Sequence, residues 1–332
     1  MPVLVLIASF VPSVALCALL IPIFRRALLA IPGARSSHVQ ATPQGGGLVV
    51  IPIAVLIAFA SLLGLAGARP DAFAWSLVAA MALLMALGCW DDWASLNPGF
   101  RLLVQAGAAA LALAATPVEW SGLFGVSPPI LVSAFLLVCM LWFINLTNFM
   151  DGIDLMSVTQ FAPAFATVYW LLAGLTGPPQ WVGAICLAGA GALLGFALLN
   201  KPRARLFLGD SGSLPLGLLG AVAILVVGGA HGLAVALLPF LYYVADASLT
   251  LARRALAGKK IWHAHREHFY QRAMQRGLSN WQVIARVALC NILLCALALL
   301  IAGRSPVAQS GAFALGVVAV AVLMSNLVSK RG

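Results

Sequence analysis

Long runs of hydrophobic residues, separated by short polar segments, occupy almost the whole chain. A helix needs about 20 mostly apolar residues to cross a bilayer. Eleven runs meet this requirement, near 3–23, 45–67, 72–90, 102–119, 128–147, 157–176, 180–199, 212–229, 231–251, 282–302 and 307–328. The pattern therefore predicts an all-α, polytopic membrane protein with about eleven transmembrane helices.

Lysine and arginine are distributed unequally between the loops that join these runs. If the N-terminus lies outside, seventeen of the nineteen basic residues fall on one side, and only Arg69 and Arg304 fall on the other. Because cytoplasmic loops carry the excess of Lys and Arg, the first side is predicted to be cytoplasmic, together with the C-terminus. Arg25 and Arg26 follow the first apolar run, which favours a transmembrane span over a signal peptide.

The composition supports one integral membrane domain over residues 1–332. Of these residues 63% are hydrophobic and 8% are charged, which excludes an ordinary soluble enzyme and a disordered protein. Cytoplasmic loops are expected near 24–44, 91–101, 147–156, 200–211 and 252–281. The net charge of +10 comes from these short loops, so we expect no nucleic-acid partner.

Acidic residues are scarce, and most of the nine fall at one side of the predicted membrane. Six lie at or near the cytoplasmic ends of spans, namely Asp91, Asp92, Asp151, Asp154, Asp210 and Asp246. Charges at membrane depth are unfavourable by several kcal/mol and usually serve a function. One such Asp could simply cap a helix, but six on one face predict a site for a divalent cation and phosphate at the inner membrane surface.

The segment from Asn145 to Asp154 reads NLTNFMDGID. If the segment is helical, Asn145, Asn148 and Asp151 are spaced three apart and share one face. Gly152 would then permit a turn that presents Asp154. Amide and carboxylate oxygens converging at the end of a span suit Mg²⁺, which prefers oxygen ligands and takes others from water and substrate phosphates.

The segment FLGDSGS, residues 207–213, opens the eighth predicted span. Asp210 is a candidate metal ligand, and Gly209 allows a close approach of the backbone. Ser211 and Ser213 would place N–H groups and hydroxyls at a helix N-terminus, which favours phosphate binding. An Asp or Ser that caps the helix is the simpler alternative, and both interpretations can hold together.

Three histidines gather in the longest predicted inner loop, in the segment HAHREHFYQR of residues 263–272. His263, His265 and His268 could ligate a transition metal, but no cysteine supports that interpretation. Together with Arg266 they fit a pyrophosphate clamp better, because arginine grips phosphate oxygens in a bidentate manner. His38 is a further candidate, close to the glycine turn TPQGGG of residues 42–47.

These motifs together resemble the polyprenyl-phosphate N-acetylhexosamine-1-phosphate transferases, the MraY/WecA-like superfamily. The resemblance extends from about Arg35 to Arg276 and rests on five segments in the family's order. They are DDWASLNPGFRLLVQ from Asp91, NLTNFMDGID from Asn145, NKPRARLFLGDSGS from Asn200, PFLYYVADASLTLARR from Pro239 and HAHREH from His263. Leu155 stands where the family has a second glycine, and the histidine loop most resembles the branch that initiates O-antigen or similar polysaccharides.

The resemblance implies a reaction at the cytoplasmic face of the bacterial inner membrane. A UDP-N-acetylhexosamine donates sugar-1-phosphate to undecaprenyl phosphate, which yields undecaprenyl-diphospho-sugar and UMP and would start lipopolysaccharide O-antigen synthesis. Mg²⁺, or Mn²⁺ as a substitute, would be the cofactor. The alternatives are the muramoyl-pentapeptide branch of the superfamily and, from another class, a secondary transporter. A transporter would place its carboxylates near the midplane, often within inverted repeats, and neither feature is evident.

The resemblance also suggests a role for each candidate residue. Asp210 and Asn148 would bind the metal, Asp91 would deprotonate or orient the lipid phosphate, and Asp92 would support it. Asp151 and Asp154 would organise the metal and nucleotide region. The expected substrate-binding residues are Asn145, Asn200, Phe207, Arg101, His263, His265, Arg266 and His268, with Asp154, Asn200 and Phe207 near the uridine. The transferred sugar, a covalent intermediate and the oligomeric state, a homodimer included, stay open.

Overall fold

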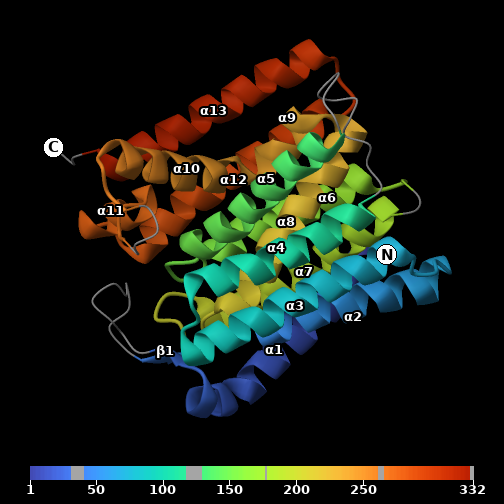
Figure 1. Ribbon diagram of the computed structural model, residues 1–332, viewed down its shortest axis with the longest axis horizontal. Coiled ribbons are helices and arrows are strands. Elements are labelled where there is room, and N and C mark those ends of the chain that lie inside the picture. Colours follow the sequence, from blue (N-terminus) through green and yellow to red (C-terminus); the bar gives the residue numbers. More distant parts are fainter. Residues whose placement is uncertain (31–40, 117–128, 176–177, 261–264, 330–332) are drawn as a thin grey trace.

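The structure is a computed structural model, and it describes residues 1–30, 41–116, 129–175, 178–260 and 265–329. The chain forms a helical bundle with one small pair of strands (Figure 1). In order, the elements are α1 (Pro2–Ala27), β1 (Leu29–Ala30), β2 (Thr42–Pro43), α2 (Gly47–Ala66), α3 (Ala72–Ala94), α4 (Pro98–Ala115), α5 (Pro129–Met150), α6 (Met156–Leu172), α7 (Pro178–Asn200), α8 (Asp210–His231), α9 (Leu233–Leu237), η2 (Leu238–Phe240), α10 (Leu241–Leu256), α11 (Phe269–Gln275), α12 (Asn280–Ile301) and α13 (Pro306–Val328).

Each of the eleven predicted spans corresponds to helical structure. Ten helical segments in the described part of the chain are long and apolar enough to cross a membrane. The remaining predicted span is α6, which is 17 residues long and contains Pro163. Helix α1 begins and helix α13 ends at opposite ends of the bundle (Figure 1). The prediction of an all-α, polytopic membrane protein is confirmed.

Helices α7 and α8 form the centre of the bundle. In each of them 83% of the residues in the most apolar 18-residue stretch are buried inside the protein. The corresponding shares for α1 and α13 are 28% and 33%. Small residues allow this close packing, because a Cβ added at Gly191 or Gly195 would lie 2.6 or 2.5 Å from backbone oxygens of α1. The glycine- and alanine-rich composition of the second, seventh and eighth spans therefore serves helix contact.

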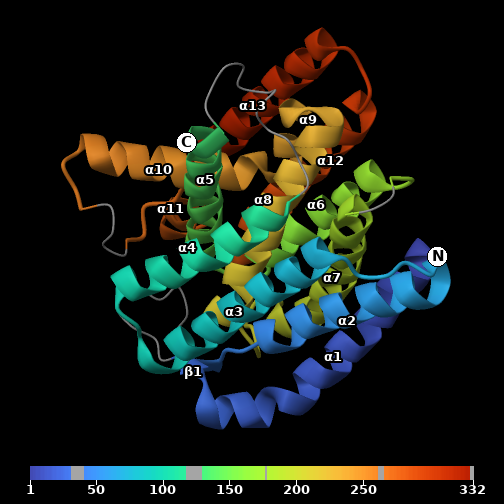
Figure 2. The ribbon, with the colours of Figure 1, turned by 45° about the vertical axis from the view of Figure 1, so that its right-hand side comes forward.

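The ninth predicted span, 231–251, is broken rather than continuous. It divides into α9, the 3-10 turn η2 and α10, which continues to Leu256. Pro239 lies in η2, where a proline cannot donate a helical hydrogen bond. The side chain of Gln160 on α6 donates to the Pro239 carbonyl at 2.7 Å. After this break α10 leaves the bundle at an angle (Figure 2).

The two short strands fasten the first loop to the start of α8. Strands β1 and β2 pair antiparallel, with Leu29 opposite Pro43 and Ala30 opposite Thr42. Gln44 then forms a parallel bridge with Phe207, and the Gly46 and Gly47 N–H groups donate to the carbonyls of Phe207 and Leu208, both at 2.9 Å. We call the end of the bundle where α3, α5 and α10 end and α8 begins the site end.

Candidate active site

Arg101 joins two of the predicted carboxylates at the site end. It lies in the first turn of α4, and its guanidinium contacts Asp91 Oδ2 at 2.6 Å and Asp210 Oδ2 at 3.2 Å. Asp91 Oδ1 accepts a hydrogen bond from the Leu96 N–H at 2.7 Å, so its carboxylate is fixed from both sides. The side chains of Arg101 and Asp210 are about a quarter exposed, which leaves this pair accessible to a ligand.

Asp92 points away from Asp91 and caps α8. Its two carboxylate oxygens accept hydrogen bonds from the backbone N–H groups of Asp210 at 3.1 Å and Ser211 at 3.3 Å. The next two N–H groups, of Gly212 and Ser213, donate to the Gly209 carbonyl. These N–H groups are already engaged, so the prediction that they are free for phosphate is wrong, because a carboxylate from α3 supplies the anion instead.

The two asparagines of α5 face different partners. Asn148 Nδ2 donates to Asp210 Oδ1 at 2.7 Å and to Ser213 Oγ at 3.0 Å. Asn145 Nδ2 donates to Gln105 Oε1 of α4 at 2.7 Å. Because α5 ends at Met150, Asp151 lies just beyond the helix rather than on its face, which corrects the helical interpretation of this segment.

Asp151 and Asp154 are held inside the loop between α5 and α6. Asp151 Oδ1 accepts a hydrogen bond from Ser157 Oγ at 2.6 Å, and burial raises the pKa of Asp151 to about 7. Asp154 Oδ2 accepts from the N–H groups of Arg203 and Ala204 at 3.1 and 3.3 Å. The two carboxylates therefore organise this loop and the one between α7 and α8.

Asn200 has a structural role in the same region. Its Oδ1 accepts from the Leu155 N–H at 2.7 Å and its Nδ2 donates to the Leu206 carbonyl at 2.9 Å. The side chain is buried, so it supports rather than lines the predicted nucleotide region. Phe207 is half-buried beside it and pairs its backbone with the first loop.

The histidine loop is the segment between α10 and α11, residues 257–268. Its described residues 265–268 pack against α10. His268 is buried and its Nδ1 lies 3.1 Å from Asp246 Oδ1. The ring of His265 lies 4.9 Å from that of His268 and is less buried. Arg266 is partly exposed, whereas His263 and His38 lie outside the described residues. Among the described members of the predicted clamp, His265 and Arg266 are therefore the ones that an anionic ligand could reach.

Three further residues shape the site: Gly88, which the sequence did not single out, and Gln44 and Gly47 of the glycine turn TPQGGG. A Cβ at Gly88 would lie 2.3 Å from the Asp210 backbone, and one at Gly47 would lie 2.1 Å from the Gly212 nitrogen. Gln44 Nε2 donates to the Asp92 carbonyl at 3.1 Å. The sequence signal was the glycine turn for Gln44 and Gly47 and the small size of Gly88, but the partner of each could not be read from the spacing.

The donor set at Asp210 fits a magnesium ion better than a zinc ion. In the described part of the chain no three His, Cys, Asp or Glu side chains converge on one point, as zinc requires. Mg²⁺ needs only one or two protein carboxylates, with waters and phosphates as further ligands. Asp210 can supply the carboxylate and Asn148 an amide oxygen, provided that Asn148 presents its Oδ1 rather than the Nδ2 that now faces Asp210.

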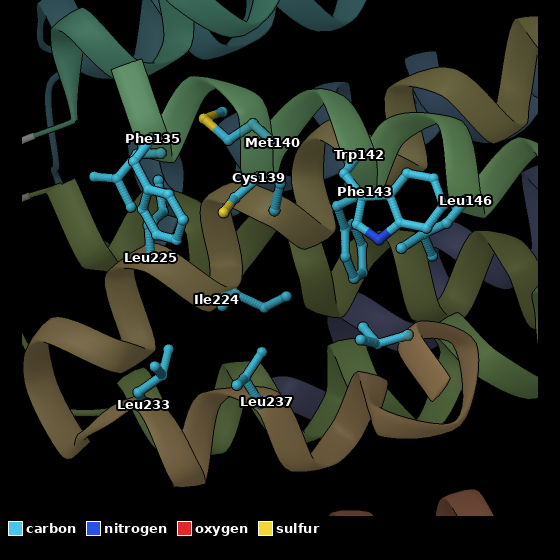
Figure 3. A pocket seen from close by; sticks show the side chains of 13 residues that line it. Phe135, Cys139, Met140, Trp142, Phe143, Leu146, Ile224, Leu225, Leu233 and Leu237 are labelled. Carbon is cyan, nitrogen blue, oxygen red and sulfur yellow. The ribbon is translucent and has the colours of Figure 1, made fainter. Parts of the chain in front are cut away.

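An apolar pocket of about 250 Å³ lies between α5, α8 and α9 (Figure 3). On α5 it is lined from Phe135 to Leu146, and Leu233 and Leu237 of α9 form the opposite wall. Leu146 and Asn148 are two residues apart on α5 and lie on different faces of that helix, so Asn148 does not line the pocket. Its lining suits a hydrocarbon chain.

Comparison with known proteins identifies the family. The model for glycosyl transferase family 4 matches residues 74–228. The chain is 33% identical over 300 residues to the decaprenyl-phosphate N-acetylglucosaminephosphotransferase of Mycolicibacterium smegmatis, a match that covers 79% of this chain and 72% of that protein. It is 32% identical over 262 residues to the phospho-N-acetylmuramoyl-pentapeptide-transferase of Lactiplantibacillus plantarum, covering 73% and 78%.

A second pentapeptide-transferase, from Prochlorococcus marinus, is 34% identical over 209 residues, and there the match spans about half of that protein, 53%. Relatives of both kinds thus carry polyprenyl or muramoyl phosphotransferase names. The residues that match the family model, 74–228, include Asp91, Asn148 and Asp210. The chain therefore belongs to glycosyl transferase family 4, the MraY/WecA-like superfamily of membrane phospho-sugar transferases.

Proposed function

We propose that the protein transfers N-acetylhexosamine-1-phosphate from a UDP-sugar to undecaprenyl phosphate, with UMP as the second product. The observation that carries the proposal is the contact of Asp91, Arg101, Asp210 and Asn148 at one end of a membrane-spanning bundle. A site at the membrane surface can take one soluble and one lipid-linked phosphate substrate. The glycan started in this way would be O-antigen or a similar surface polysaccharide.

The reaction exchanges one phosphoanhydride bond for another. An oxygen of the lipid phosphate attacks the sugar-linked phosphorus of the donor, the bond to the UMP oxygen breaks, and UMP leaves with the electron pair. Asp91 orients the lipid phosphate and accepts any proton it carries. Arg101 is placed between Asp91 and Asp210, where its guanidinium offsets the charge of the phosphates.

A magnesium ion, when bound at Asp210 and Asn148, would offset the negative charge that develops on the diphosphate. Asp92 fixes the position of Asp210 through its two backbone hydrogen bonds at the start of α8. His265 and Arg266 would hold the diphosphate or the sugar. Asp151 and Asp154 hold the loops that would surround the nucleotide.

The lipid chain of the acceptor would occupy the apolar pocket between α5, α8 and α9 (Figure 3). Helix α5 supplies part of the pocket lining and ends at the site end, so the acceptor's chain would lie against a helix that also carries Asn148. The basic side of the chain makes the cytoplasmic face of a bacterial inner membrane the proposed location, where UDP-sugars are available.

The proposal is tested by UMP release from the purified full-length protein with undecaprenyl phosphate, a UDP-sugar and Mg²⁺. We expect equimolar UMP and lipid-linked diphospho-sugar, loss of activity with EDTA, and recovery with Mg²⁺ or Mn²⁺. Asp210→Asn should lower the rate at least about a hundredfold, of the order seen when a charge-stabilising group is removed. The control is Asp71→Asn, at the opposite end of α3. Wild-type-like activity of Asp210→Asn at limiting Mg²⁺ would contradict the metal assignment.

The donor is identified by a panel of substrates in the same assay. UDP-GlcNAc, UDP-GalNAc, UDP-QuiNAc and UDP-FucNAc are compared with UDP-MurNAc-pentapeptide. We expect turnover of at least one simple UDP-N-acetylhexosamine. Exclusive turnover of the pentapeptide donor would instead place the protein in peptidoglycan synthesis.

A further inference from the structure

Asp246 is a buried carboxylate in α10 whose hydrogen bonds lead to the histidine loop. It is fully buried, with 0% of its surface exposed. Two of its partners are on its own helix, Tyr242 Oη at 3.1 Å and Thr250 Oγ1 at 3.3 Å. The others are on the loop: His268 Nδ1 at 3.1 Å, and the N–H groups of Phe269 at 3.1 Å and Tyr270 at 3.4 Å.

These loop contacts occur where α11 begins. A buried carboxylate that accepts several hydrogen bonds from one segment fixes the place of that segment, because each unpaired donor would otherwise be buried without a partner. His268 and the first turn of α11 are therefore tied to the middle of α10, and both elements lie at the site end in Figures 1 and 2.

Tyr270 extends this connection to the end of α5 and the α5–α6 loop. Its ring stacks on His268 with the centroids 5.8 Å apart, and its hydroxyl donates to the Phe149 carbonyl at 3.2 Å. The same hydroxyl lies against Gly152, where an added Cβ would be only 2.1 Å away. The residue after Asn148 and the residue after Asp151 thus both contact the segment that Asp246 holds.

A second set of contacts joins the two ends of the histidine loop. Arg254, one helical turn beyond Thr250, is buried and pairs with Glu267, and its other terminal nitrogen donates to the Lys260 carbonyl at 2.9 Å. Lys259 also pairs with Glu267, at 3.0 Å. The segment between α10 and α11 is therefore held at both of its described ends, with His265 and Arg266 next to the second one.

We propose that Asp246 is a positioning residue that docks the histidine loop against the α5–α6 loop, and so places His265 and Arg266 over the donor's diphosphate. The proposal rests on the proposed function for the identity of the donor. Asp246 itself touches no substrate, since it is buried and its described partners are side chains and backbone groups of the protein.

The test compares Asp246→Asn with Thr250→Val in the purified full-length protein. Thr250→Val removes one hydrogen bond to the same carboxylate and leaves the three loop contacts in place. We expect Asp246→Asn to raise the KM for the UDP-sugar at least about fivefold, with the KM for undecaprenyl phosphate unchanged. Thr250→Val should keep both KM values within about twofold. Equal changes in both KM values for Asp246→Asn, or an unchanged donor KM, would overturn the proposal.

Hydrogen exchange of the peptide 266–277 gives a readout that does not depend on activity. Asp246→Asn should speed exchange at the Phe269 and Tyr270 amides at least about tenfold, and Thr250→Val should not. If wild type releases no UMP from any donor, the proposed function fails while the docking is still decided by exchange. If Asp246→Asn does not fold, His268→Gln replaces it, and unchanged exchange in that variant would overturn the docking.

Discussion

At the scale of single residues, Leu155 combines a left-handed backbone conformation with a buried apolar side chain. The family has glycine at this position, and Leu155 adopts φ +66°, in the left-handed region that glycine enters freely. The Leu155 side chain is 9% exposed and belongs to the core. Burial of an apolar side chain therefore offsets a backbone strain of about 1–2 kcal/mol.

This balance predicts the order of two substitutions. Leu155→Ala loses the buried side chain and keeps the strain, whereas Leu155→Gly loses the same contacts but removes the strain. We expect both variants to unfold at lower temperature than wild type in detergent, and the glycine variant to be more stable than the alanine variant by up to about 1 kcal/mol. An alanine variant that is the more stable of the two would show that the left-handed conformation is relaxed.

His265 predicts a pH dependence of stability. Burial, followed by the positive charges of His268 and Arg254, lowers the pKa of His265 from 6.5 to about 4. Between these values the unfolded chain binds more protons than the folded one, so stability falls as the pH drops from about 6.5 to 4. His265→Asn should lose less thermal stability than wild type between pH 7.5 and 4.5 in the same detergent. An equal loss in both proteins would assign the acid sensitivity to other groups.

At the scale of elements, the start of α8 depends on a residue from α3. Asp92, near the end of α3, caps the neighbouring helix α8. Asp71 caps its own helix α3 at the other end, where it accepts a hydrogen bond from the Ala74 N–H at 2.8 Å. Asp92→Ala and Asp71→Ala should each lower stability by about 1–2 kcal/mol. Only Asp92→Ala should also lower UMP release, at least about a hundredfold, because Asp210 moves with the helix end. Equal activity of the two variants at matched stability would contradict this coupling.

The elements that could be predicted are those whose signal is local. The apolar runs predict the spans, and the capping box that begins α12 is formed by two residues only three positions apart, Ser279 and Gln282. The break of the ninth span was missed, although Pro239 marks it. The side chain that donates to the Pro239 carbonyl is Gln160 on α6, which is far away in the sequence. The capping of α8 by Asp92 was missed for the same reason, since the two residues are 118 positions apart.

At the scale of the whole molecule, the predicted site residues divide into two groups. Asp91, Arg101, Asp210 and Asn148 meet directly, whereas Asn200 and His268 are buried supports. Motif spacing could indicate that all of them belong to one end of the bundle. It could not separate ligand-facing from supporting side chains, because that distinction depends on which neighbouring helix satisfies each polar group.

The orientation of the bundle in the membrane gives the last prediction. Arg276 is exposed at the site end, and Arg304 is exposed in the turn between α12 and α13, at the other end of α12. Because seventeen of nineteen basic residues are on the predicted inner side, Arg276→Cys should react with a membrane-impermeant maleimide only in inverted vesicles. Arg304→Cys should react only in right-side-out vesicles, and wild type, with its native cysteines, gives the background. The reverse pattern would place the carboxylate site on the outer face, where UDP-sugars are absent, and would contradict both the topology and the proposed donor.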